Sequence, residues 1–210
     1  MKVTALKLQS RNKSRVSVYL DGELAFGLAK IIAARLRVGQ ALDEQTIARL
    51  READEVETAY EQALKFLSSR PRSEAEVRRR LREHEAPMPA VEVVLTRLNR
   101  AGLLNDQAFA NYWVENRAAF RPRSKKALRA ELKRKGVHDE ALGQALAAAN
   151  DAETAYVLAA RRAGRLRDLP RPEFRRKLGA FLARRGFDYE TIEPIIEHVW
   201  TETHGPGVNK

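Results

Sequence analysis

Basic side chains gather in one short segment of this 210-residue chain. Residues 117–135 contain nine lysine and arginine residues against one acid, Glu131, so their formal charge is +8. Ammonium and guanidinium groups bind phosphate oxygens, and guanidinium can do so bidentately. The segment therefore indicates contact with a phosphate backbone or with an acidic protein surface. The alternative is that these residues keep a helix soluble and complement the dipole at its C-terminal end.

Three segments, spaced about 50 residues apart, contain the candidate DNA- or filament-binding residues. The middle segment supplies Arg117, Arg121, Arg123, Lys125, Lys126, Arg129, Lys133 and Arg134. The first supplies Arg78, Arg79 and Arg82, and the third supplies Arg175, Arg176 and Arg184. If Leu128 and Leu132 face a core, the basic residues around them lie on the opposite and flanking faces of a helix. Equivalent faces in the three segments would then form an interrupted basic stripe.

The residues needed for catalysis are poorly represented. The four histidines, His84, His138, His198 and His204, do not have the spacing of metal ligands, and no glycine-rich phosphate loop is present. Most acids neighbour lysine or arginine, as in solvated helical pairs, and Asp106 and Asp151 are interpreted as helix caps. We therefore expect a protein that is not an enzyme and that has no metal site and no cofactor. A nuclease site built from two carboxylates stays open as a weaker alternative.

The composition of the whole chain favours an anionic partner. Lysine and arginine outnumber aspartate and glutamate by 39 to 28, giving a formal charge of +11. The chain has no cysteine, its first seven residues lack the apolar block of a secretion signal, and no apolar run is long enough to cross a membrane. We expect a soluble cytoplasmic protein.

An internal repeat organises most of the sequence. The pair Arg-Pro occurs at Arg70, Arg121 and Arg171, spaced by 51 and 50 residues. The flanking apolar positions repeat with it, as Val77 and Leu81, then Leu128 and Leu132, then Leu178 and Leu182. The second and third copies end in Lys135-Gly136 and Arg185-Gly186, whereas the first has Glu85 in place of glycine, which predicts a differently shaped connection. This period indicates one supersecondary unit used three times.

The first forty residues have a period of two instead. Val16, Val18 and Leu20 alternate with polar residues, Asp21-Gly22 follows, and Leu24, Phe26 and Leu28 alternate again. Asp-Gly between alternating runs predicts a β-hairpin. Val3–Leu8 is a candidate third strand.

From Asp43 onward the apolar period is helical. Asp43 is the expected cap of a linking helix, and each repeat is expected to contain three helices with stops at Gly102 and Gly136. The predicted parts are a β-rich element at 1–42, a linking helix with repeat 1 at 43–104, repeat 2 at 105–150 and repeat 3 at 151–204. Residues 205–210 are expected to be a disordered tail.

Four strings in register resemble the RecX family of bacterial recombinase regulators. They are Ser73-Glu74-Ala75-Glu76-Val77-Arg78-Arg79-Arg80-Leu81, Gly102-Leu103-Leu104-Asn105-Asp106-Gln107-Ala108-Phe109-Ala110, Glu131-Leu132-Lys133-Arg134-Lys135-Gly136-Val137 and Phe181-Leu182-Ala183-Arg184-Arg185-Gly186-Phe187. They span roughly residues 60–199, and the N-terminus is similar to the extension of longer members. Related chains often carry glycine before the middle helix, whereas this chain has Arg121-Pro122-Arg123-Ser124 there.

The resemblance implies a mainly α fold of three tandem three-helix bundles in an elongated, curved array, with the small β-hairpin element added. It implies binding to the RecA recombinase filament, with inhibition of ATP hydrolysis, strand exchange and coprotease activity. It also implies contacts with single- and double-stranded DNA, and no catalytic residues. We expect a monomer.

A second hypothesis is a stand-alone DNA-binding protein or transcription regulator, because three-helix units resemble helix-turn-helix modules. Ser124–Lys135 would then be a recognition helix. Its lysine-rich composition, without asparagine or glutamine to read adenine, favours phosphate contact over base reading.

Overall fold

The computed structural model describes residues 1–205, so most of the predicted tail lies outside the described residues. Contacts divide the chain into two compact units, Met1–Leu104 and Asn105–Lys210. Each unit is described by itself below. The domain limits expected from the sequence stay a prediction.

The first unit begins with a three-stranded antiparallel sheet in the order β1-β2-β3. Its strands are β1 (Val3–Leu8), β2 (Arg15–Leu20) and β3 (Glu23–Ala29). The hairpin and the third strand are therefore confirmed. Asp21 and Gly22 have φ values of 50° and 96°, which suits a tight turn between twisted strands.

The alternation predicted for the hairpin holds in β2 and fails in part of β3. Val16, Val18 and Leu20 are buried, as is Leu28. Leu24, however, was expected on the same inner face as Leu28 and is 62% exposed. The register shifts between Val18 and Tyr19, and such an irregularity changes which face the neighbouring side chains occupy.

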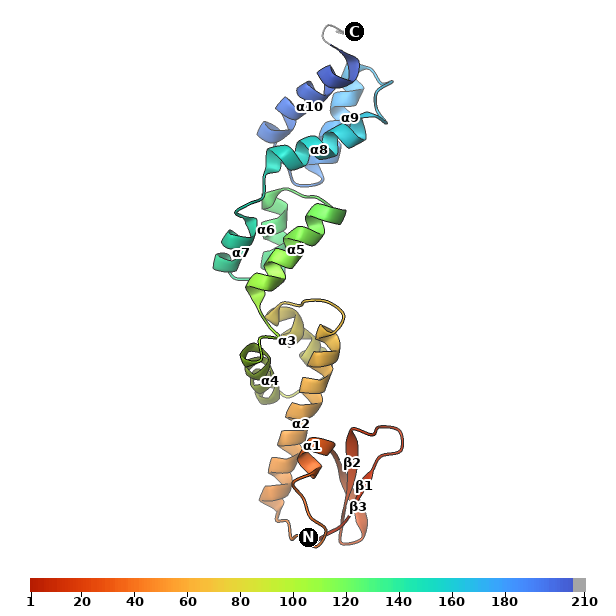
Figure 1. Ribbon diagram of the computed structural model, residues 1–210, viewed down its shortest axis with the longest axis vertical. Helices are drawn as coiled ribbons and strands as arrows, with labels where there is room; N and C mark the ends of the chain where they lie inside the picture. The colour runs from red at the N-terminus through yellow and green to blue at the C-terminus, as the bar shows by residue number, and fades with distance from the viewer. Residues whose placement is uncertain (206–210) are drawn as a thin grey trace. The chain divides into compact units, whose positions relative to one another are not determined.

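One long helix, α2 (Glu44–Leu67), contributes to two separate cores (Figure 1). The side chain of Asp43 caps it by accepting a hydrogen bond from the Thr46 amide at 2.7 Å, as predicted. Its first half packs through Ile47 against the sheet and the short helix α1 (Lys30–Ala33). Its second half packs through Ala59 and Ala63 against the first repeat. The helix therefore joins the β-rich element to the first repeat within the first unit.

Three-helix groups follow the expected period. The first repeat adds α3 (Glu74–Glu83) and α4 (Met88–Arg100) to the end of α2. The second contains α5 (Asp106–Phe120), α6 (Lys125–Arg134) and α7 (Asp139–Leu146). The third contains α8 (Asp151–Ala163), α9 (Arg171–Ala183) and α10 (Tyr189–His204). The apolar positions that repeat in the sequence are all buried, namely Val77, Leu81, Leu128, Leu132, Leu178 and Leu182.

Two helix caps differ from the sequence prediction. Asn105 and Asn150 cap α5 and α8, accepting from the amides of Ala108 and Glu153, so the assignment of Asp106 and Asp151 as caps was wrong. Asparagine and aspartate side chains are equally good caps, and at the start of both helices an aspartate directly follows the asparagine, so the residue types alone do not show which of the two is the cap. Asp151 instead accepts a hydrogen bond from the amide of Lys125 at 2.7 Å, at the start of α6.

The connection after α3 also differs from the prediction. Glu85 has φ of 58°, in the left-handed region, like Gly136 at 79° and Gly186 at 90° in the other repeats. Repeat 1 therefore keeps the backbone turn of its relatives without the glycine, and the expected difference in shape was wrong. An L-residue in this conformation costs about 1–2 kcal/mol.

We expect Glu85→Gly to stabilise the protein, because it removes the left-handed strain. Glycine's greater chain entropy offsets roughly 0.5–1 kcal/mol of that gain, so the expected net gain is about 0.5–1 kcal/mol. Urea unfolding measures it, with Glu83→Gly as control: the same substitution inside α3 should destabilise by about 1 kcal/mol. Equal losses for both variants would contradict a strained Glu85.

The start of α6 is joined to the end of α9 inside the second unit. Ser124 is 1% exposed; its hydroxyl accepts from the Ala127 amide at 3.2 Å and donates to the Gly186 carbonyl at 2.6 Å. The Ser124 amide donates to the Arg185 carbonyl at 3.1 Å. A Cβ on Gly186 would lie 2.7 Å from the Ala127 Cβ. The close approach of repeats 2 and 3 therefore requires glycine at residue 186.

Gly186→Ala should destabilise the second unit by about 2–4 kcal/mol, since overlap with Ala127 adds to the strain of a positive φ. Gly143→Ala is the matched control. A Cβ there meets open space within α7, so this variant should gain up to about 1 kcal/mol. Chemical unfolding compares the two, and an unchanged midpoint for Gly186→Ala would contradict the tight junction.

Candidate nucleic-acid interface

Helix α6 holds the most exposed part of the candidate site. Leu128 and Leu132 are buried in the core of repeat 2, as predicted, and this fixes the rotation of the helix. Lys125, Lys126 and Arg129 are exposed on the remaining surface. The structure places none of these three in an ion pair with a carboxylate of residues 1–205. Their charges are therefore available to a partner, although the pKa of the nearby Asp188 carboxyl, lowered mainly by hydrogen bonding to Thr191, is also lowered by Lys126.

Arg117 and Arg123, by contrast, belong to a partly buried cluster around Glu131. The Glu131 carboxylate, 8% exposed, accepts from Arg117 Nε at 2.7 Å and from Trp113 Nε1 at 2.9 Å. Arg123 Nε lies 3.1 Å from the other carboxylate oxygen. The guanidinium of Arg117 also stacks 4.4 Å from the centroid of the Trp113 ring. These two arginines hold α5 and the α5–α6 turn against α6.

The same cluster sets the protonation of Glu131. Burial raises the pKa of this carboxyl, but hydrogen bonds from Arg117 and Trp113 lower it by more. The pKa therefore lies below its usual value of 4.5. Glu131 is consequently ionised at neutral pH and offsets part of the positive charge of residues 117–135.

The remaining candidates divide in the same way. Arg78 pairs with Glu92 and with Glu74, and its hydrogen bond to Glu92 raises its pKa. Ion pairs also join Arg79 to Glu83 at 3.8 Å, Lys133 to Asp139 at 3.1 Å, and Arg175 to Glu193 and Glu197. Across the described residues, the predicted site residues without a carboxylate partner are Arg82, Arg121, Lys125, Lys126, Arg129, Arg134, Arg176 and Arg184. The stripe along all three repeats stays a prediction.

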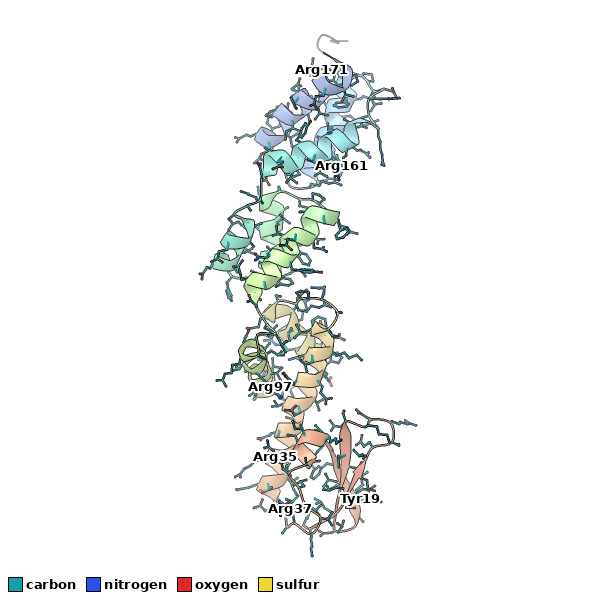
Figure 2. The ribbon with its side chains drawn as sticks, viewed as in Figure 1. Tyr19, Arg35, Arg37, Arg97, Arg161 and Arg171 are labelled. Carbon is teal, nitrogen blue, oxygen red and sulfur yellow. The ribbon has the colours of Figure 1, made fainter. Side chains whose placement is uncertain are left out.

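Sequence reasoning missed one group of basic residues and part of a second. Residues 1–42 contain eight lysine and arginine residues against two acids, a local excess that a count would have found. On the sheet, Lys7 lies 4.9 Å from the centroid of the Tyr19 ring, which Figure 2 labels. The second group joins Arg123 and Arg184, which were predicted, to Arg162 near the end of α8, which was not. It could not be found by counting, because its members come together only through folding.

Acidic residues do not form a metal site in the part of the chain that the structure describes: no three histidine, aspartate or glutamate side chains are close enough to share an ion. A cavity of about 460 Å³ lies beside α5, α7 and the start of α8, lined among others by Glu115, Arg123 and Asp151. Outside this cavity, Phe120, next to Arg121, is 77% exposed and is the most exposed aromatic side chain among the described residues. No helix among the described residues is long and apolar enough to span a membrane.

Replacing Glu131 with glutamine should destabilise the protein by about 1–3 kcal/mol at pH 7, because Arg117 and Arg123 lose their charged partner. A lowered pKa stabilises the folded state above the unfolded value of 4.5, and this stability is lost as pH falls through the folded pKa. The difference between wild type and variant should therefore shrink below pH 4.5.

Unfolding by urea at several pH values measures this difference. Glu140→Gln, in the exposed first turn of α7, is the control and should change stability by less than about 0.5 kcal/mol. A loss for Glu131→Gln that stays constant from pH 7 to pH 3 would contradict the ionised cluster.

Comparison with protein families accounts for most of the chain. The first, second and third three-helix domains of RecX match residues 59–98, 105–146 and 149–196. The regulatory protein RecX N-terminal domain matches residues 1–43. The β-rich N-terminus and the three helical groups thus fall in one family.

Individual relatives agree with this. A regulatory protein RecX from Limosilactobacillus reuteri is 31% identical over 203 residues, covering 94% of this chain and 76% of the relative. One from Bacillus subtilis is 28% identical over 202 residues, with coverage of 94% and 76%.

Solved structures match the fold as well. A crystal structure of regulatory protein RecX has a TM-score of 0.73 and 30% identity, covering 93% of this chain and 98% of that one. The RecX structure from Lactobacillus salivarius has a TM-score of 0.62 and 26% identity over 70% of this chain and 97% of that one. Since the family domains match segments of both units, and a relative and a crystal structure of the family match more than nine-tenths of this chain, this chain belongs to the RecX family of regulatory proteins.

Proposed function

We propose that this chain binds the RecA–DNA filament and inhibits its ATPase, strand-exchange and coprotease activities, with accessory DNA binding through a basic face. Membership of a family of regulatory proteins supports the regulatory role. The observation that carries the binding role is the exposed, unpaired charge of Lys125, Lys126 and Arg129 on α6. The proposed action is stoichiometric binding without catalysis.

The division of charge on repeat 2 favours a protein–nucleic acid filament as target. A filament offers phosphates and acidic side chains together, and both attract exposed ammonium and guanidinium groups. Because α6 is held by its buried Leu128 and Leu132 and at its start by Ser124, the backbone that carries its cations is fixed before the partner arrives. Preorganised groups lose less entropy on binding than mobile ones.

The experiment that tests the proposal is ATP hydrolysis by RecA on single-stranded DNA, titrated with this protein after filaments have formed. A parallel titration contains excess free DNA, which removes simple competition for DNA. The proposal predicts inhibition that survives the excess DNA. Unchanged hydrolysis at saturating protein would contradict it.

A second candidate is the stand-alone DNA-binding protein, which the unpaired lysines of α6 also favour. In the same titration, this candidate predicts inhibition that excess DNA abolishes. It also predicts a sequence-specific footprint on DNA without recombinase. A helix with lysine and arginine side chains, and without asparagine or glutamine to read adenine, is however better suited to phosphate contact.

Lys125→Glu combined with Arg129→Glu should leave folding intact, because both side chains are exposed. DNA binding should weaken, and the slope of log affinity against log salt should flatten by about 2, the equivalent of two phosphate contacts. Binding to a labelled oligonucleotide across a salt series measures this.

The control is Arg161→Glu combined with Arg165→Glu, which has the same spacing and charge change on exposed residues of repeat 3. Its slope should change by less than half as much. Equal effects of the two pairs would mean that only net charge matters and that α6 is not the binding face.

A further inference from the structure

Arginine side chains from three segments meet in the second unit. Arg162 comes from the last turn of α8, Arg184 and Arg185 follow the end of α9, and Arg123 precedes α6. The guanidinium carbon of Arg185 lies 3.7 Å from the centroid of the Phe181 ring, and that of Arg162 lies 5.5 Å from it. Two guanidinium groups therefore share one aromatic ring.

This cluster has little negative charge of its own. Within residues 1–205, neither Arg162 nor Arg184 nor Arg185 forms an ion pair with a carboxylate. Among the described residues, the one carboxylate paired with a member of the cluster is Glu131, which lies 3.1 Å from Arg123 and is also bound by Arg117. Several like charges are thus held together without matching anions.

The hydrogen bonds of the cluster are also incomplete. Arg185 donates one bond, from Nη1 to the carbonyl of Phe181 at 3.1 Å. The Nε of Arg162 is shielded from solvent and has no acceptor among the described residues. A buried donor without an acceptor costs about 1–3 kcal/mol. The fold therefore tolerates a group that is not satisfied by its own side chains.

Electrostatics agree with this geometry. Burial lowers the pKa of Arg185, and repulsion from Arg184, Arg123 and Arg162 lowers it further. Guanidinium nevertheless stays protonated in proteins, so the cluster keeps its full positive charge. Such an arrangement is unfavourable in the free protein and becomes favourable when an anion enters it.

We propose that Arg162, Arg184 and Arg185 bind a phosphodiester group of a nucleic-acid backbone, with Arg123 beside them. The planar fork of guanidinium fits phosphate oxygens bidentately, which an ammonium cannot do. The site deepens the DNA-binding part of the proposed function and is independent of filament binding.

Continuity with α6 favours a polynucleotide over a small anion. The Arg185 carbonyl accepts from the Ser124 amide at 3.1 Å, so the arginine cluster adjoins the first turn of α6. Lys125 and Lys126 follow directly and are exposed. A free phosphate would need only the arginines, whereas successive phosphates of one strand can reach both groups.

Arg162→Gln tests the site, and Arg161→Gln is the matched control. Arg161, labelled in Figure 2, is the neighbouring residue on α8, is exposed and undergoes the same charge change. The probe is a labelled single-stranded oligonucleotide of mixed sequence, titrated across a salt series without recombinase. Arg162→Gln should weaken binding about tenfold at low salt and flatten the salt slope by about 1. Arg161→Gln should do less than half of this.

Three results would overturn the proposal. Equal effects of the two variants would mean that only net charge matters. Loss of affinity for inorganic pyrophosphate in Arg162→Gln, with unchanged DNA affinity and slope, would assign the cluster to small anions. Unchanged DNA binding with lost inhibition of RecA would assign it to an acidic protein surface. If the wild-type protein failed to inhibit RecA, the proposed function would be contradicted but the phosphate site would not, since the DNA titration contains no recombinase.

A second variant guards against a folding defect. Arg162→Lys keeps the charge and loses the planar fork, so it should keep the wild-type salt slope while binding several-fold more weakly. Thermal unfolding of all variants without DNA should give midpoints within a few degrees, because Arg162→Gln loses a ring contact and also relieves repulsion. An Arg162→Lys variant with full wild-type affinity would contradict bidentate binding.

Discussion

The hydroxyl of Ser124 is the contact on which the second unit depends. It accepts from the Ala127 amide and so begins α6, and it donates to the Gly186 carbonyl and so joins α6 to the end of α9. Ser124 is almost fully buried, and a Cβ on Gly186 would lie 2.8 Å from its hydroxyl oxygen and 2.7 Å from the Ala127 Cβ, so residue 186 must be glycine. This junction sets the start of α6 and the position of Arg185 beside it, while burial of Leu128 and Leu132 sets which side chains of the helix are exposed.

Some basic side chains in this protein stabilise the fold and others are exposed to a partner, and the distance to a carboxylate distinguishes the two groups. Arginines that reach a carboxylate, such as Arg117 at Glu131 and Arg78 at Glu92, hold neighbouring helices together. Lys125, Lys126 and Arg129 on α6 have no such ion pair in the described structure and are exposed. The formal charge of +11 therefore does not show how many positive charges are free to bind a partner, because some arginines are already paired within the protein. A local count of unpaired groups is more informative than net charge about where binding occurs.

The sequence predicted those parts of the fold that depend on local pattern. The three helical groups, the hairpin at Asp21-Gly22 and the inward faces of Leu128 and Leu132 follow from period and turn chemistry, and all were confirmed. Glu85 was misjudged, because a residue type alone does not reveal a strained backbone angle that its surroundings impose. Leu24 was misplaced, because a register shift between strands depends on pairing at a distance.

The candidate site was less predictable than the fold. Residue types identified α6 as basic, but the distinction between paired and unpaired arginines needs three-dimensional distances. Arg117 stood first in the predicted set but is bound to Glu131. Arg162 was absent from that set, yet it lies in a cluster with Arg185, which is 23 residues away in the sequence. Contacts between distant segments are the information that one sequence, without its homologues, does not contain.

The central claim of this account is that the unpaired cations of α6 face the RecA filament. Lysine acylation of the free and the filament-bound protein, read residue by residue, tests it most directly. The account predicts that Lys125 and Lys126 lose most of their reactivity on the filament, while Lys65, exposed in the first unit, changes less. If Lys125 and Lys126 react equally in both states while the protein is fully bound, α6 is not the contact face and the account is wrong.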